Sequence, residues 1–150
     1  MTRLKDQLQA DLTAAMKARD ELRSATLRMV LTAVRNEEVA GKTARELSDD
    51  EVVAVLTREA KKRREAAEAY DGGGRPERAE RERAEGVVID GYLPAQLTDD
   101  ELQQLVAAAI AEASAEGPRA MGQVMKVLTP RTAGRAEGSR VAAEVRRQLG

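Results

Sequence analysis

The residues whose types could do chemistry gather near the C-terminal end of the chain, around a turn punctuated by glycine. Lys126, Arg131, Arg135 and Arg140 supply positive charge there. The helix predicted to open at Gly138-Ser139 adds backbone amides that have no helical partner of their own. Guanidinium groups and free helix-start amides together bind anions well, so this stretch predicts an anion site. Its spacing matches no P-loop or dinucleotide fingerprint.

The distribution of charge along the chain agrees with an anionic ligand for this region. Residues 118–150 hold seven Lys/Arg and two Asp/Glu, whereas the first 117 residues hold eighteen and twenty-four. The formal net charge of −1 is therefore the sum of about −6 for residues 1–117 and about +5 for residues 118–150. Such asymmetry indicates that the C-terminal piece meets something anionic, and a merely solubilising surface is the alternative.

The composition bounds the remaining chemistry. The chain has no His and no Cys, which removes the commonest general base, thiolate metal ligands and a Cys nucleophile. A Ser–Lys pair is the nucleophilic arrangement that stays open. We therefore expect no catalytic residue, no metal site and no cofactor. The lack of Cys fits a cytoplasmic protein, and no apolar run approaches the length of a membrane span.

Two acidic triplets, Asp49-Asp50-Glu51 and Asp99-Asp100-Glu101, could bind a hard cation. Both lie in the first turn of a predicted helix, where carboxylates meet the positive end of the helix dipole and free amides. We therefore favour helix capping over cation binding for both triplets.

A basic cluster, Arg58 to Arg64, lies in the middle of a predicted helix. Arg58, Lys61 and Lys62 share one face of that helix by their spacing. Two interpretations stay open: a track for phosphates, or a solvated face that pairs with acidic residues elsewhere.

The elements that must position these residues are all helices. Apolar residues recur at helical spacing, and no segment alternates with the period of two that a strand requires. The sequence predicts four helices, a short hinge and three more helices. The side chains expected to be buried in the first three helices are Leu4, Leu8, Leu12 and Met16, then Leu27, Met29, Val30, Leu31 and Val34, then Val52, Val53, Leu56, Ala60 and Tyr70. Methionines 29, 121 and 125 are expected to fill gaps in the core.

Several boundaries are marked by residue type. Asp20 is expected to cap the second helix, and Ser48 with Glu51 forms a capping box for the third. The three glycines from Gly72 to Gly74 predict a mobile tip. Pro130 is expected to end a short apolar helix. The fourth helix starts at a proline, and its Arg/Glu-rich part from residue 77 to 85 is expected to be solvated.

Pro94 marks the division of the chain, because it biases Leu93 away from helical geometry. We predict two domains: residues 1–93 form an N-terminal four-helix, bundle-like domain, and residues 94–150 form a small three-helix C-terminal tail domain.

At these residues the chain resembles a known family. It is similar to the small bacterial YqeY proteins, and hence to the C-terminal helical and tail region of GatB, the B subunit of the tRNA-dependent amidotransferases. The matching pieces are Leu27-Arg28-Met29, Asn36-Glu37, Arg58-Glu59 with Lys61 and Arg63, Tyr92-Leu93-Pro94, Gln96-Leu97, Met121-Gly122, Met125-Lys126, Pro130-Arg131, Gly134-Arg135-Ala136 and Gly138. Two positions depart from the family pattern. Glu137 stands where Asp is usual, and Gly86 where a large apolar residue is usual, which predicts a poor final cap and a softer fourth helix.

The resemblance implies a helical bundle followed by a small tail, and a connection with tRNA, because the tail of the amidotransferase reaches the elbow of tRNA. Similar modules are appended to a glutaminyl-tRNA synthetase in some bacteria. Amidotransferase (carbon–nitrogen ligase) catalysis is not implied, because that chemistry belongs to the large N-terminal part of GatB, which this chain does not contain.

We therefore expect a non-catalytic module that recognises folded tRNA by shape and phosphate contacts, since the chain has almost no aromatic residues for stacking on bases. The residues expected to bind RNA are Gly122, Lys126, Arg131, Gly134, Arg135 and Arg140, with the glycines letting RNA approach the backbone. The alternative is an adaptor that docks on an amidotransferase or an aminoacyl-tRNA synthetase through the acidic front half. We expect neither DNA nor a membrane as a partner.

Overall fold

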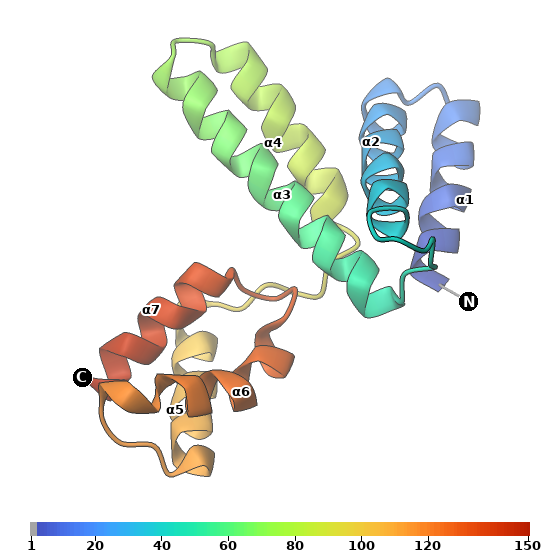
Figure 1. Ribbon diagram of the computed structural model, residues 1–150. Coiled ribbons are helices and arrows are strands. Elements are labelled where there is room, and N and C mark those ends of the chain that lie inside the picture. Colours follow the sequence, from blue (N-terminus) through green and yellow to red (C-terminus); the bar gives the residue numbers. More distant parts are fainter. Residues whose placement is uncertain (1–2) are drawn as a thin grey trace. The chain divides into compact units, whose positions relative to one another are not determined.

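The computed structural model describes residues 3–150, apart from the side chain of Pro118 (Figure 1). These residues form seven α-helices and one short 3-10 helix, and the described part of the chain contains no strand. The prediction of an all-helical protein is therefore confirmed. The chain divides into two compact units, residues 1–93 and 94–150, which we call unit 1 and unit 2. None of the described helices has the length and apolar character that crossing a membrane requires.

Unit 1 contains two antiparallel helix pairs. The first pair is α1 with α2 and the longer second pair is α3 with α4, and α2 packs against both members of the second pair (Figure 1). The helices are α1 (Arg3–Lys17), α2 (Glu21–Glu38), α3 (Asp49–Gly72) and α4 (Pro76–Asp90). Their apolar faces meet in one core built largely from Leu and Val.

The helix starts in unit 1 follow the predicted capping chemistry. The Asp20 side chain accepts a hydrogen bond from the Arg23 amide at the start of α2. At the start of α3, Ser48 and Glu51 each accept a hydrogen bond from the backbone amide of the other, which completes the capping box. Pro76 occupies the first turn of α4. The Asp49–Glu51 triplet therefore lies in a capped first turn, where its negative charges interact favourably with the positive end of the helix dipole.

The buried faces differ from the predicted ones in each of the first three helices. In α1, Ala15 takes the core position after Leu12, and Met16 is exposed. A step of four residues overshoots a helical turn by about 40°, so a strict i, i+4 stripe rotates out of the core. In α2, Met29 is 40% exposed, so the prediction that it fills the core was wrong. In α3, Val55 is buried instead of Val53, and Tyr70 is only half-buried.

The glycine-rich connection between α3 and α4 is a closed turn. Gly72 still belongs to α3, and the amides of Gly73 and Arg75 donate to the carbonyls of Ala69 and Tyr70. Gly74 has a φ of 71°, a left-handed conformation that glycine adopts without steric cost. This turn lets α4 return antiparallel along α3.

Unit 2 is a small three-helix group with its own core. Its elements are α5 (Asp99–Ala113), the 3-10 helix η1 (Pro118–Ala120), α6 (Met121–Thr132) and α7 (Gly138–Leu149). Thr98 and Glu101 form a second capping box at the start of α5. The core is centred on Val106, Val124, Leu128 and Val145, and Met121 and Met125 pack half-buried against it, as predicted.

The helix α6 does not end at Pro130 but continues to Thr132. Proline removes the amide that would have bonded to the Lys126 carbonyl, but this costs little in a last turn with few bonds left. The Ala133 amide donates to the Thr129 carbonyl at 3.0 Å, and the Thr132 hydroxyl donates to the Leu128 carbonyl at 3.3 Å. The predicted stop is therefore displaced by half a turn.

Candidate nucleic-acid interface

The open face of α6 carries two of the predicted RNA-binding residues. Gly122 and Lys126 lie one turn apart, so they share a face of the helix, and both are exposed. A Cβ added to Gly122 would meet nothing within 4 Å. Packing therefore does not require glycine here, although glycine in a helix costs about 1 kcal/mol relative to alanine. The backbone is left uncovered next to a lysine, which suits close approach of an anionic chain.

Arg131 lies at the end of the same helix and is held by an acid. Its guanidinium is 2.6 Å from the Glu112 carboxylate on α5, and its side chain is 40% exposed. A pair at this exposure contributes about 1 kcal/mol or less, because water screens both charges. An incoming phosphate can therefore replace Glu112 as the partner of Arg131 at small cost.

The turn after α6 is fastened to the segment that leads into α5. Gly134 takes a φ of 74°, and its carbonyl accepts a hydrogen bond from the Gln96 side chain at 2.8 Å. The Arg135 carbonyl accepts from the Leu97 amide at 2.8 Å, and the Arg135 side chain donates to the Ala95 carbonyl at 3.3 Å. Arg135 is therefore a structural clamp as well as a cation. The left-handed turn explains why residue 134 is glycine.

Arg140, in the first turn of α7, faces the start of α5. Its guanidinium is 2.7 Å from the Asp99 carboxylate. Glu137 holds the N-cap position of α7 without a side-chain capping hydrogen bond, as the sequence predicted. The hydrogen bond from the Thr98 amide is the main cause that holds the pKa of Glu101 below its usual value, and the Thr98 side chain and the charge of Arg135 add to this effect.

The predicted cations form an extended array instead of one compact pocket. Arg131 pairs near the C-terminal end of α5, at Glu112, and Arg140 pairs at its N-terminal end, at Asp99. A rise of 1.5 Å per residue places these two pairing points roughly 20 Å apart along α5. Such a spread fits several phosphates of a nucleic-acid backbone better than a single small anion.

The two units do not differ in net charge as the two ends of the sequence do. Residues 94–150 contain seven basic and seven acidic residues, so unit 2 has no formal net charge. Residues 1–93 contain eighteen basic and nineteen acidic residues, so unit 1 has a net charge of −1. The asymmetry between residues 1–117 and 118–150 is therefore not an asymmetry between the units, because five acids, of α5 and the segment that follows it, belong to unit 2 with the C-terminal cations.

The basic cluster on α3 is mostly a paired surface. Arg58 is 3.5 Å from Glu37 of α2, and Lys61 is 3.9 Å from Glu65. These contacts favour the interpretation of a solvated face over that of a phosphate track. Arg63 departs from both interpretations, because its side chain is only 8% exposed.

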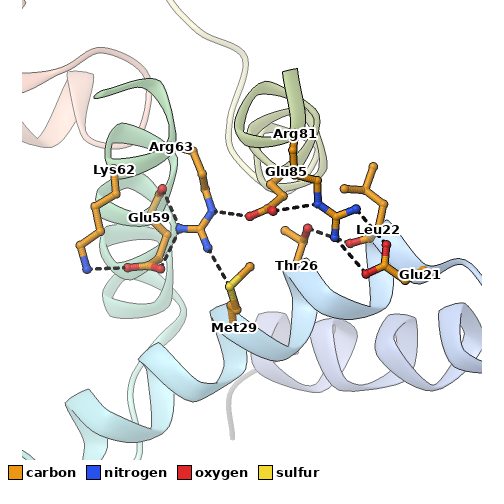
Figure 2. Close-up of polar contacts among 9 residues, drawn as sticks. All are labelled: Glu21, Leu22, Thr26, Met29, Glu59, Lys62, Arg63, Arg81 and Glu85. Atoms are coloured by element: carbon orange, nitrogen blue, oxygen red, sulfur yellow. Dashed lines mark hydrogen bonds and ion pairs between the residues drawn. The ribbon is translucent and has the colours of Figure 1, made fainter. Parts of the chain in front are cut away.

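Arg63 is the centre of a chain of alternating charges that links three helices (Figure 2). Its Nη1 is 2.9 Å from the Glu59 carboxylate on α3, and its Nε is 3.5 Å from Glu85 on α4. Arg81 continues the chain from Glu85, at 3.1 Å, to Glu21 on α2, at 2.8 Å. At the other end, Lys62 pairs with Glu59 at 3.1 Å. We call these six residues the charge chain.

The charge chain corrects the expectation that the Arg/Glu-rich part of α4 is simply solvated. Glu85 is buried, and Arg81 connects α4 to α2. Burial raises the pKa of Glu59, but hydrogen bonds from Arg63 and Lys62 outweigh burial and leave this pKa below its usual value. Burial and the neighbouring charge of Glu85 raise the pKa of Glu82. The charge chain therefore stabilises the packing of α2, α3 and α4 against one another.

Comparison with known protein families decides the relationship of the chain. The model of the family described as Yqey-like protein matches residues 5–149. The chain belongs to the YqeY family. The resemblance to YqeY proteins, stated from the residues, is therefore confirmed, and the match covers both units. A search of curated proteins found no match.

In this YqeY chain, sequence reasoning missed residues that make long-range structural contacts. Arg63 and Glu59 continue the spacing of the buried residues Val52, Leu56 and Ala60 along α3. That spacing was the available signal, and it was overlooked because charged residues are rarely buried. The role of Gln96 had only a weak signal, a polar residue two positions after Pro94. Its partner, the carbonyl of Gly134, is distant in the sequence.

Proposed function

We propose that this YqeY protein is a non-catalytic module that binds folded tRNA through unit 2, by shape and by phosphate contacts. The observation that carries the proposal is the open backbone of α6 at Gly122 beside the exposed cation Lys126. Packing gives no reason for glycine at that position. A ligand that approaches the backbone closely gives one.

The arrangement of the arginines supports a polyanionic ligand. Arg131 and Arg140 are surface cations in pairs of low strength, roughly 20 Å apart along α5. The chain has only two aromatic residues, both tyrosines, and both lie in unit 1. Stacking on splayed bases therefore cannot supply the binding energy, whereas contacts to phosphates and riboses of a folded RNA can.

The proposal is tested by binding of the purified full chain to total tRNA. Labelling the methionine methyl groups with ¹³C allows unit 2 to be observed directly, because Met121 and Met125 lie on α6 beside Gly122 and Lys126. Addition of tRNA should shift these two methyl resonances. Shifts only at the methionines of unit 1, or no binding at moderate salt, would contradict the proposal.

The second candidate is an adaptor that docks on an amidotransferase or an aminoacyl-tRNA synthetase. The observation that favours it is the formal neutrality of unit 2, which weakens long-range attraction to RNA. A pull-down from bacterial lysate with and without nuclease separates the two functions. Nuclease should release whatever co-purifies if RNA is the ligand, whereas a stoichiometric protein partner that stays bound after nuclease supports the adaptor.

A further inference from the structure

A groove on the surface of unit 1 has no part in the proposed RNA interface. It lies between α2 and α3 and has a volume of about 560 Å³. Its lining includes Arg28, Met29, Asn36, Glu59, Lys62 and Arg63. The groove thus combines an exposed thioether with three cations and one acid, and the acid already belongs to the charge chain.

The apolar part of the groove is a strip along α2. Ala25, Met29 and Ala33 follow each other at intervals of four residues, so they share one face of the helix. The small alanines on either side of Met29 create the hollow, and Met29 is 40% exposed within it. A flexible, polarisable thioether in such a position adapts to the shape of an apolar side chain that enters the groove.

The polar part of the groove is a cationic surface on α3, where, among the described residues, a hydrogen-bond donor of Arg63 lacks a strong acceptor. Glu59 already accepts hydrogen bonds from Lys62 at 3.1 Å and from Arg63 at 2.9 Å. The Nη2 of Arg63 contacts the Met29 sulfur at 3.6 Å, and this sulfur is a weak hydrogen-bond acceptor (Figure 2). The buried Nε of Arg63 makes no hydrogen bond and faces Glu85 at 3.5 Å. A nearly buried guanidinium therefore lies at the groove with hydrogen-bonding capacity left over.

We propose that this groove binds an acidic peptide segment of a partner protein. A Leu- or Met-like side chain of the segment packs on Met29, and an Asp or Glu side chain pairs with Arg28, Lys62 and the Nη2 donor of Arg63. Charge complementarity identifies the class of partner, because three cations line the groove and its one acid, Glu59, pairs with two of them, which leaves an excess of positive charge. The apolar strip argues against a nucleic acid as the occupant, since it offers no donor to phosphate and no ring for stacking on a base.

The experiment selects a ligand and then maps where it binds. A phage-displayed library of random peptides of about twelve residues is panned on the full-length protein, and enriched peptides are titrated into protein with ¹³C-labelled methionine methyl groups. The proposal expects enriched peptides that combine Asp or Glu with Leu, Ile or Met, and a saturable shift of the Met29 methyl. Because Met121 and Met125 report on unit 2, failure of this proposal is distinguishable from failure of tRNA binding.

Substitutions then test the two halves of the groove. The double variant Arg28→Ala/Lys62→Ala should weaken binding of the selected peptide by about ten-fold or more, and Met29→Lys should abolish binding of the fluorescently labelled peptide, measured by fluorescence polarisation. Arg58→Ala/Lys61→Ala is the matched control on α3, and it should bind as the wild type does. The proposal is overturned if no peptide is enriched, if the enriched peptides are basic, if the Met29 methyl does not respond, or if tRNA shifts that methyl instead.

Discussion

Replacement of Arg63 should destabilise unit 1 far more than replacement of any surface cation near it. The Arg63→Ala variant leaves Glu59 and Glu85 buried, with side chains only 11% and 9% exposed, and without the cation between them. Breaking a buried pair by removing one partner costs about 3–5 kcal/mol. Glu59 keeps Lys62 and Glu85 keeps Arg81, each at 3.1 Å, so we expect the lower end, about 3 kcal/mol.

The assay is urea unfolding of the full chain followed by circular dichroism, with Arg58→Ala as the control on the same helix. Arg58 is 58% exposed and 3.5 Å from Glu37, so its loss should cost less than about 1 kcal/mol. The triple variant Glu59→Leu/Arg63→Met/Glu85→Leu should be more stable than Arg63→Met alone, because no charge then stays buried and unpaired. Equal losses for Arg63→Ala and Arg58→Ala would refute the account of the charge chain.

Three further predictions concern stability. Gly86→Ala should raise the free energy of unfolding by up to about 1 kcal/mol in thermal melts, because a Cβ there would lie 4.0 Å from the Arg63 Cβ, an ordinary contact. A lower melting temperature would show that α3 and α4 need to approach more closely. The lowered pKa values of Glu38, held mainly by its hydrogen bond from Lys5, and of Glu59 predict stability that is present above the unfolded pKa near 4.5 and is lost as pH falls below it. Urea midpoints measured from about pH 6 to about pH 3 should fall less steeply for Glu59→Gln than for wild type, and parallel curves would contradict the assignment. Residues 94–150 alone should give a cooperative helical transition of marginal stability, whereas a coil signal would contradict the predicted division into two domains.

Local chemistry made much of the fold predictable. The capping residues Asp20 and Ser48 and the first-turn Pro76 act within a few residues of themselves, and each behaves as its type predicts. The predictions failed where small angular deviations add up along a helix, or where contacts join residues that are distant in the sequence. The stripe of α1 rotates from Met16 to Ala15 because four residues exceed one turn.

The site was less predictable than the fold, because its geometry depends on contacts that are distant in the sequence. Arg131 and Arg140 were identified as cations, but their partners Glu112 and Asp99 lie on another helix. The clamp of Arg135 on Ala95 joins residues forty positions apart. Spacing along one helix gives no information on such pairs. The neutrality of unit 2 was predictable, because the boundary predicted at Pro94 already places the acids between residues 99 and 116 with the C-terminal cations.

The contacts of each arginine decide which substitutions test the RNA interface. Arg135 holds the turn after α6 through the Ala95 carbonyl, so its replacement mixes lost binding with lost stability. Arg81 and Arg83, in the Arg/Glu-rich part of α4, pair with Glu21 and Asp71 on other helices, so they are unsuitable as neutral controls. Lys126 with Arg131 is the cleaner pair of test positions. Lys17 with Lys42 is the better control, because both are exposed and lie in unit 1.

The measurement that tests the central claim most directly is the affinity of the full chain for total tRNA across a salt series. Each phosphate contact releases condensed counterions, so the logarithm of affinity should fall linearly with the logarithm of salt concentration. The variant Lys126→Ala/Arg131→Ala should bind tRNA more weakly, and its salt slope should be shallower by roughly the contribution of two phosphate contacts. The variant Lys17→Ala/Lys42→Ala should keep the wild-type slope. Equal affinities and slopes for the two double variants would show that α6 is not the RNA site.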